Sequence, residues 1–139
     1  STALTEEIIE SYSVFGLHEQ YNSVAIYQFL EENYCTLTFF EEYLDGRLLT
    51  NDLSSFTEEK GSSFGLEIDM DSIENMPTSA YTPSGFTLNE IRSAVRKLAS
   101  SKPVYLHLPE GAPETAKEKT IVGKALAYLV SDFIKSTTK

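Results

Sequence analysis

The stretch FGLEIDMD, residues 64–71, has the alternation of a half-buried β-strand. Apolar side chains occupy every second position and small or acidic ones the positions between, namely Phe64, Leu66, Ile68 and Met70 against Gly65, Glu67, Asp69 and Asp71. Successive side chains of a strand point to opposite faces of the sheet. The pattern therefore predicts a strand with one face on the core and one in solvent.

A helix and another strand are predicted after this stretch. The sequence Thr87-Leu-Asn-Glu90 is a capping box, in which the threonine hydroxyl and the glutamate satisfy free backbone N–H groups. Pro103 opens a strand to residue 108, in which Tyr105 and His107 alternate with aliphatic residues. The three segments 62–71, 87–99 and 103–108 form a β-α-β unit that allows one parallel pairing.

A β-hairpin is predicted on the N-terminal side. Cys35, Leu37 and Phe39 alternate with threonines, as in a strand with an apolar face. Asp45-Gly46 follows, a dipeptide that tolerates positive φ at both positions of a type I′ turn. This turn would place Leu44 opposite Arg47.

Helices are predicted at both ends of the chain, at residues 4–12 and 22–32 and at about 114–135. The segment 52–60 is read as a short helix or a loop, so the predicted order is α-α-β-β-β-α-β-α. This order indicates an α+β fold with a small, mainly antiparallel sheet of about four strands and terminal helices packed on it. One globular domain is expected over residues 1–139.

The chain is strongly acidic, with a formal net charge of −10 and a pI near 4.6. Residues 1–80 carry 16 acidic and two basic residues, a net charge of −14. Residues 81–139 carry five acidic and nine basic residues, a net charge of +4. The net charge argues against nucleic acid and anionic membrane as partners. The uneven distribution indicates a basic protein partner instead.

The cysteine content points to a reducing, cytoplasmic environment. Cys35 is the only cysteine, so no disulfide can form within one chain. The sequence has no apolar run of membrane-spanning length, and its N-terminus lacks the pattern of a signal peptide.

Three carboxylates, Glu67, Asp69 and Asp71, are expected on one face of a strand because they lie two residues apart. Alternate residues of a strand are about 6.5–7 Å apart, so three such carboxylates cannot converge on a cation without further donors. A metal site would need carboxylates from a neighbouring strand, and Glu41 or Glu42 are possible donors. A solvated acidic face is the favoured interpretation, and the sequence predicts no metal site and no cofactor.

No catalytic residue is predicted. Cys35 with His107 or His18 would be the only conceivable thiol–imidazole pairs, but Cys35 falls in the apolar phase of its strand. Gly123-Lys124 lacks the second glycine and the hydroxyl residue of a phosphate loop. His107 is expected beside Tyr105 on the outer face of its strand.

The function predicted from these features is a non-enzymatic acidic binding protein that masks a basic protein surface, as immunity proteins and inhibitors of nuclease toxins do. The predicted partner-binding residues combine acidic and aromatic side chains, namely Glu41, Glu42, Tyr43, Asp45, Glu67, Asp69 and Asp71. Two alternatives remain open. One is a small-molecule- or metal-binding domain with a pocket near His107, and the other is a secretion-chaperone-like or structural dimeric subunit.

Overall fold

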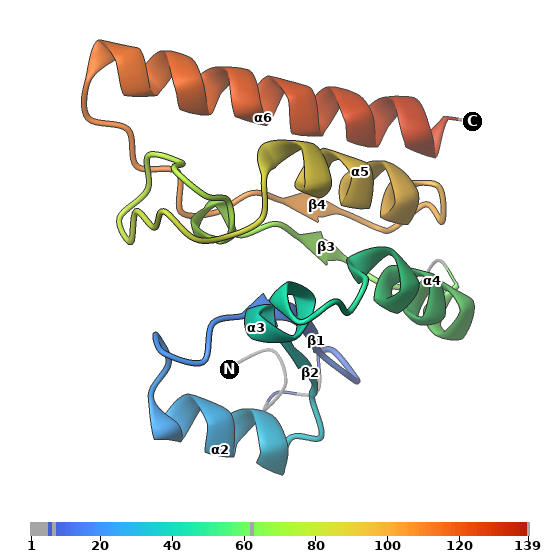
Figure 1. The fold of residues 1–139 in the computed structure, drawn as a ribbon. Coiled ribbons are helices and arrows are strands. Elements are labelled where there is room, and N and C mark those ends of the chain that lie inside the picture. The colour runs from blue at the N-terminus through green and yellow to red at the C-terminus, as the bar shows by residue number, and fades with distance from the viewer. Residues whose placement is uncertain (1–5, 7, 62, 139) are drawn as a thin grey trace. The chain divides into compact units, whose positions relative to one another are not determined.

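The computed structural model describes residues 6, 8–61 and 63–138, which divide into two compact units at Leu48 (Figure 1). The first unit comprises residues 1–48 and the second residues 49–139. Compactness alone does not show that either part folds by itself, so one domain over 1–139 stays a prediction. Among the described residues, no helix is both long and apolar enough to cross a bilayer.

The first unit is a β-α-β unit followed by a short helix. Strand β1 (Ser13–Leu17) leads to helix α2 (Val24–Glu32), strand β2 (Thr36–Phe39) and helix α3 (Phe40–Leu44). The two strands pair in parallel, from Ser13 opposite Thr36 to Leu17 opposite Phe39. The register shifts between Phe15 and Leu17, where Gly16 takes a φ of +84°. A glycine adopts this conformation at little cost, so a bulge forms there.

The predicted hairpin at Asp45-Gly46 is wrong, because the segment before it is helical. Phe40–Leu44 forms α3, and the Glu42 carboxylate accepts a hydrogen bond from the Phe39 N–H (3.0 Å). Arg47 N donates to Glu42 O (3.0 Å) and Gly46 N to Tyr43 O (3.2 Å), with Gly46 at a φ of +103°. This is the Schellman end of a helix. A glycine that tolerates positive φ serves a helix end as well as a hairpin turn.

Two further predictions for this unit also need correction. The predicted alternation around β2 is observed only in part, since Thr36 is exposed but Thr38 is 1% exposed, whereas Cys35, Leu37 and Phe39 are half-buried. The predicted helix over 4–12 falls partly on residues outside the described ones, and the described residues 8–12 are not helical.

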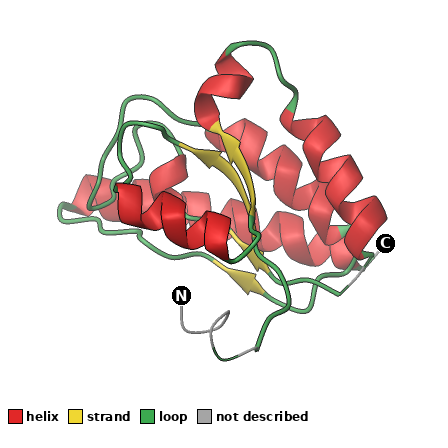
Figure 2. Ribbon diagram, turned by 90° about the horizontal axis from the view of Figure 1, so that it is seen from below, coloured by secondary structure: helices red, strands yellow, loops and turns green. Residues whose placement is uncertain are grey.

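The second unit contains another parallel pair of strands connected by a helix (Figures 1 and 2). Its elements are helix α4 (Leu49–Lys60), strand β3 (Leu66–Glu67), a 3₁₀ turn (Met70–Ser72), helix α5 (Leu88–Ala99), strand β4 (Leu106–His107) and helix α6 (Ala116–Thr137). The described residues thus form two two-stranded parallel sheets. The predicted four-stranded, mainly antiparallel sheet is wrong, because each pair is joined by a helix and not by a tight turn.

The predicted capping box at Thr87 forms, and a second one, which was not predicted, begins α6. Thr87 Oγ1 accepts the Glu90 N–H at the start of α5, and Thr115 does the same for Glu118 at the start of α6. The apolar side of residues 64–70 is buried, as its alternation predicts. The core also includes residues of the second unit's helices and loops, namely Leu53, Ile73, Met76, Phe86, Ile91, Val95, Leu98, Val122 and Leu129.

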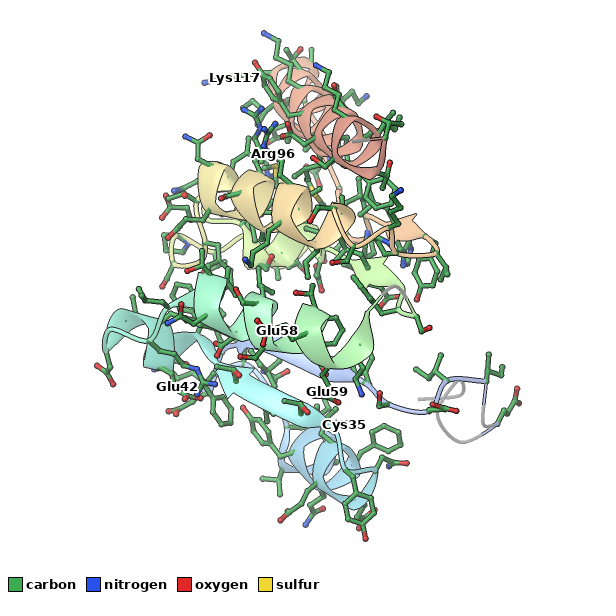
Figure 3. The ribbon with its side chains drawn as sticks, turned by 90° about the vertical axis from the view of Figure 1, so that its right-hand side faces the viewer. Cys35, Glu42, Glu58, Glu59, Arg96 and Lys117 are labelled. Atoms are coloured by element: carbon green, nitrogen blue, oxygen red, sulfur yellow. The ribbon has the colours of Figure 1, made fainter. Side chains whose placement is uncertain are left out.

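A buried carboxylate joins α5 to α6. Asp132 of α6 accepts hydrogen bonds from Arg92 Nε (2.7 Å) and Arg96 Nη1 (3.2 Å), and its side chain is 6% exposed. Arg92 also lies over the ring of Tyr128, 4.3 Å from its centroid. The label of Arg96 in Figure 3 marks this side of α5. The hydrogen bond from Arg92 holds the pKa of Asp132 below its ordinary value, and Arg96 adds to this effect against the opposing burial.

We expect Asp132→Asn to reduce the free energy of unfolding by about 1.5–3 kcal/mol at neutral pH, because it removes a charged acceptor from two arginines. The folded state binds fewer protons at Asp132 than the unfolded state does. The contribution of Asp132 is therefore present above the ordinary aspartate pKa and is lost as the pH falls through the lowered pKa. Urea unfolding of wild type and variant should converge in acid. Asp45→Asn, at an exposed position, is the control, and an equal loss in both variants would contradict the role of the cluster.

Leu129→Ala in α6 should cost about 2–5 kcal/mol, because Leu129 is fully buried among core side chains. Leu126 on the same helix is only half-buried, so Leu126→Ala should cost less. Val130→Ala is the matched control on the same helix, at a position 41% exposed. Equal melting temperatures for the Leu129 and Val130 variants would show that the inner stripe of α6 is not core.

Candidate functional site

The parallel pairing of β3 and β4 extends beyond the two strands. Backbone hydrogen bonds run from Val104 N to Phe64 O, from Leu66 N to Tyr105 O, from Ile68 N to His107 O and from Met70 N to Pro109 O, at 2.9–3.1 Å. The carboxyl ends of the two strands therefore meet at one edge. In open sheets of parallel strands, ligands bind in the crevice outside this edge.

Carboxylates follow both strands at this edge, Asp69 and Asp71 after β3 and Glu110 after β4. Asp69 Oδ1 accepts the Asp71 N–H (2.9 Å) at the start of the 3₁₀ turn. The pKa of Asp69 lies above its ordinary value, first because its carboxylate is partly desolvated and further because Asp71, Glu110 and Glu67 repel its charge. The Asp71 N–H opposes this rise. The edge thus concentrates negative charge.

An imidazole lies beside these carboxylates. Glu67 and His107 are directly opposite in the register of β3 and β4, and His107 Nδ1 lies 3.3 Å from Glu67 Oε1. Both side chains point to the outer face of the pair, where His107 is 58% and Glu67 42% exposed. The predicted placement of His107 beside Tyr105 on this face is confirmed, since both side chains are largely exposed. We call Glu67, Asp69, Asp71, His107 and Glu110 the carboxyl-edge cluster.

The loops around the carboxyl-edge cluster are held by backbone contacts. Thr78 pairs with Gly111 in an antiparallel bridge, and Ala112 N donates to Pro77 O (3.1 Å). A side chain at Gly85 would place its Cβ 2.6 Å from Ser72 O, so only glycine allows this approach to the 3₁₀ turn. These contacts hold the segment 109–112, which contains Glu110, against residues 77–78.

The carboxylates of the carboxyl-edge cluster suit a hard divalent cation, for which carboxylate oxygens are suitable ligands. Asp71 Oδ1 is buried and makes no hydrogen bond, which is a costly state for a carboxylate oxygen in the absence of a cation. Among the residues that the structure describes, however, no three His, Cys, Asp or Glu side chains are close enough to surround one ion. The edge offers donors for part of a metal site.

The predicted partner-binding residues fall into two groups. Glu67, Asp69 and Asp71 belong to the carboxyl-edge cluster, whereas Glu41, Glu42, Tyr43 and Asp45 lie on or just after α3 in the first unit. The suggestion that Glu41 or Glu42 adds donors from a strand next to β3 is wrong, because α3 is helical and β2 pairs with β1. Glu41 lies 3.6 Å from His18 Nδ1, and Glu42 pairs with Arg47 (2.7 Å). Partner binding by these residues stays a prediction.

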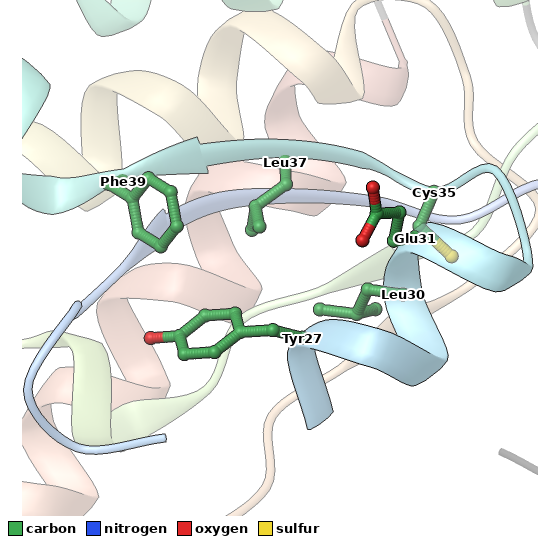
Figure 4. A pocket seen from close by; sticks show the side chains of 6 residues that line it. All are labelled: Tyr27, Leu30, Glu31, Cys35, Leu37 and Phe39. Carbon is green, nitrogen blue, oxygen red and sulfur yellow. The ribbon is translucent and has the colours of Figure 1, made fainter. Parts of the chain in front are cut away.

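The thiol of Cys35 does not have the environment of a nucleophile. Its burial raises the pKa, which lowers the fraction of reactive thiolate. The Sγ atom lies 3.9 Å from the carbonyl oxygen of Asn33. A pocket of about 410 Å³ borders it, lined from α2 by Tyr27, Leu30 and Glu31 and from the β2 segment by Cys35, Leu37 and Phe39 (Figure 4). This lining is mostly apolar, with Glu31 as its charged side chain.

Glu110 is the member of the cluster that sequence analysis missed. The segment 109–113 reads as a turn-rich loop because of its prolines and glycine. Its position in the sequence could have indicated a role in the site. Glu110 follows the second strand of a β-α-β unit, and parallel strands carry ligands at their carboxyl ends.

No family model and no curated protein matches the sequence. The structure, in contrast, resembles solved enzymes. It matches formimidoylglutamase from Bacillus subtilis with a TM-score of 0.83 at 20% identity, over 99% of this chain and 45% of that one. It also matches Trypanosoma cruzi formiminoglutamase solved with Mn²⁺ (TM-score 0.70, 16% identity, 87% and 42% of the chains) and arginase from Bacillus caldovelox (0.64, 19%, 80% and 39%).

These likenesses establish that the chain shares the fold of part of these proteins. It spans less than half of the length of each of them. The predicted function, a non-enzymatic immunity or inhibitor protein, is wrong in the light of this finding, since the structural neighbours are enzymes.

Proposed function

We propose that this chain is part of a hydrolase of the formimidoylglutamase or arginase type, and that its carboxyl-edge cluster contributes to a Mn²⁺ site. The observation that carries the proposal is the position of Asp69, Asp71 and Glu110 outside the carboxyl ends of two parallel strands. The shared fold with enzymes of these names, one of them solved with Mn²⁺, supports it.

The electrostatics of the edge support a cation there. Desolvation raises the pKa of Asp69, and repulsion from Asp71, Glu110 and Glu67 raises it further. A divalent cation bound at the edge would relieve this repulsion. Carboxylates of the carboxyl-edge cluster would contribute part of the oxygen ligands, and Asp71 Oδ1 has no protein partner to give up. When bound, such an ion supplies a Lewis acid and lowers the pKa of a coordinated water.

The residues of the chain also suit the substrates that the two enzyme names imply. Formimidoylglutamate and arginine both present a cationic C–N group, of formimino and guanidino type respectively. The negative charge of the carboxyl-edge cluster attracts such a group and orients it toward the edge. Further metal ligands must come from residues other than those described, because the described ones do not surround an ion.

Mn²⁺ titration followed by electron paramagnetic resonance tests the metal site. We expect the chain to bind Mn²⁺ and both Asp69→Asn and Glu110→Gln to weaken binding by about 10-fold or more, since each removes a charged oxygen donor. Glu58→Gln is the matched control, because it removes one negative charge from an exposed position on α4 (Figure 3). If all three variants weakened Mn²⁺ binding equally, the chain would attract the cation by its overall negative charge and not through the carboxyl-edge cluster.

Incubation of the Mn²⁺-loaded chain with N-formimidoylglutamate or arginine tests the reaction. Consumption of either compound that depends on Mn²⁺ and is lost in Asp69→Asn supports the hydrolase directly. Mn²⁺ binding without turnover is the result expected if essential ligands lie outside the described residues. A chain that binds no Mn²⁺ contradicts the proposal.

A further inference from the structure

We propose that the pocket between α2 and the β2 segment binds a small aliphatic amine. The alkyl chain packs on the apolar lining, and the ammonium group pairs with the Glu31 carboxylate (Figure 4). All of the lining residues belong to the first unit, whereas the carboxyl-edge cluster lies in the second. The proposal is therefore independent of the proposed hydrolase.

The pocket has the size and the lining of a small-molecule site. Its volume of about 410 Å³ falls within the range of about 300–1,000 Å³ that such sites occupy. These sites are lined mostly by apolar and aromatic side chains, with a few polar groups that fix the orientation of the ligand. The lining here combines apolar and aromatic residues with one thiol and one carboxylate, namely Tyr27, Leu30, Leu37, Phe39, Cys35 and Glu31.

Secondary structure builds the two walls of the pocket. Tyr27, Leu30 and Glu31 are three or four positions apart on α2, so they lie on one side of the helix. Leu37 and Phe39 are two positions apart on β2, so they point to one face of the strand. The local folding of each segment thus places its lining side chains together.

The two ends of the pocket differ in chemistry. Figure 4 shows Tyr27 and Phe39 at one end and Glu31 and Cys35 at the other. The rings of Tyr27 and Phe39 pack edge to face, with centroids 5.8 Å apart. The Tyr27 hydroxyl donates to the carbonyl oxygen of Glu19 (3.0 Å), which holds this ring in place. An apolar end and an acidic end match a ligand with an alkyl chain and a cationic head.

The charge of the first unit favours a cation. Residues 1–48 contain nine acidic residues and one arginine, a net charge of −8. The arginine, Arg47, pairs with Glu42 (2.7 Å), so no lysine or arginine in the described part of this unit is available to Glu31. A surface with charge of one sign raises the local concentration of ions of the opposite sign. The same surface repels a carboxylate ligand with an equal alkyl chain.

Cys35 borders the acidic end and reports on occupancy. Burial raises the pKa of its thiol, so the group is neutral at neutral pH and adds a polarisable, weakly polar surface to the lining. Cys35 is the only cysteine of the chain, so alkylation has a single target. A ligand in the pocket covers the thiol and slows this reaction.

Two probes with the same alkyl chain test the class of ligand. We expect n-octylammonium to bind with a Kd of about 1 mM or below in isothermal titration calorimetry. Octanoate should bind at least about 10-fold more weakly, because Glu31 repels its carboxylate. Equal affinities of the two compounds overturn the proposal, as does a Kd for octylammonium above about 10 mM.

Glu31→Gln tests the anchor of the ammonium group. We expect this variant to bind octylammonium about 10-fold more weakly, because a charge-assisted hydrogen bond is lost. Glu32→Gln is the matched control, since it removes the same charge from the next position of α2, outside the lining. Both positions are exposed, so the melting temperatures of the variants should agree with wild type. Equal losses of affinity in both variants overturn the role of Glu31.

Alkylation of Cys35 by iodoacetamide, followed by mass spectrometry, locates the ligand. Octylammonium at about ten times its Kd should slow the reaction about 10-fold, because only the free fraction of the chain reacts. Octanoate at the same concentration is the control and should protect less. An unchanged rate with saturating octylammonium places its binding elsewhere and overturns the proposal. None of these results depends on Mn²⁺, so failure here and failure of the proposed function are distinguishable.

Discussion

The parallel hydrogen-bond ladder between residues 64–70 and 104–109 is the constraint on which the second unit depends. It requires a crossover connection, which α5 provides, and the apolar face of α5 is buried. It also fixes which residues share the carboxyl edge. Asp69 and Glu110 are 41 positions apart in sequence, and the ladder brings the segments that carry them together.

The two faces of β3 differ in burial and in charge. Phe64, Leu66, Ile68 and Met70 are buried and hold the strand against the helices. Glu67 and Asp69, at the alternate positions, are charged and exposed, so they do not contribute to the core. Partial burial raises the pKa of Asp69, and repulsion from Asp71, Glu110 and Glu67 raises it further. Such repulsion reduces folding stability, and a bound cation offsets it, which connects the local electrostatics to the proposed metal site.

The helices of the second unit stabilise this arrangement from one side. In Figure 1, α5 lies between α6 and the β3–β4 pair. Leu129 and Val95 are fully buried, and Asp132 bridges α5 and α6 through two arginines. This polar contact is specific in geometry, because a buried carboxylate accepts only where the guanidinium groups reach it. The edge thus rests on a rigid layer, which a site of defined geometry requires.

The sequence by itself determined the local features. The capping box at Thr87 and the two-faced alternation of residues 64–70 depend on neighbours within a few positions, and both formed. Strand direction, the burial of Thr38 and the pairing of Glu67 with His107 depended on tertiary structure. The physical reason is that Asp45-Gly46 satisfies the backbone equally in a hairpin turn or a helix end, and only long-range packing selects one. The same holds for the site, since its members come from separate segments that the parallel ladder alone brings to one edge.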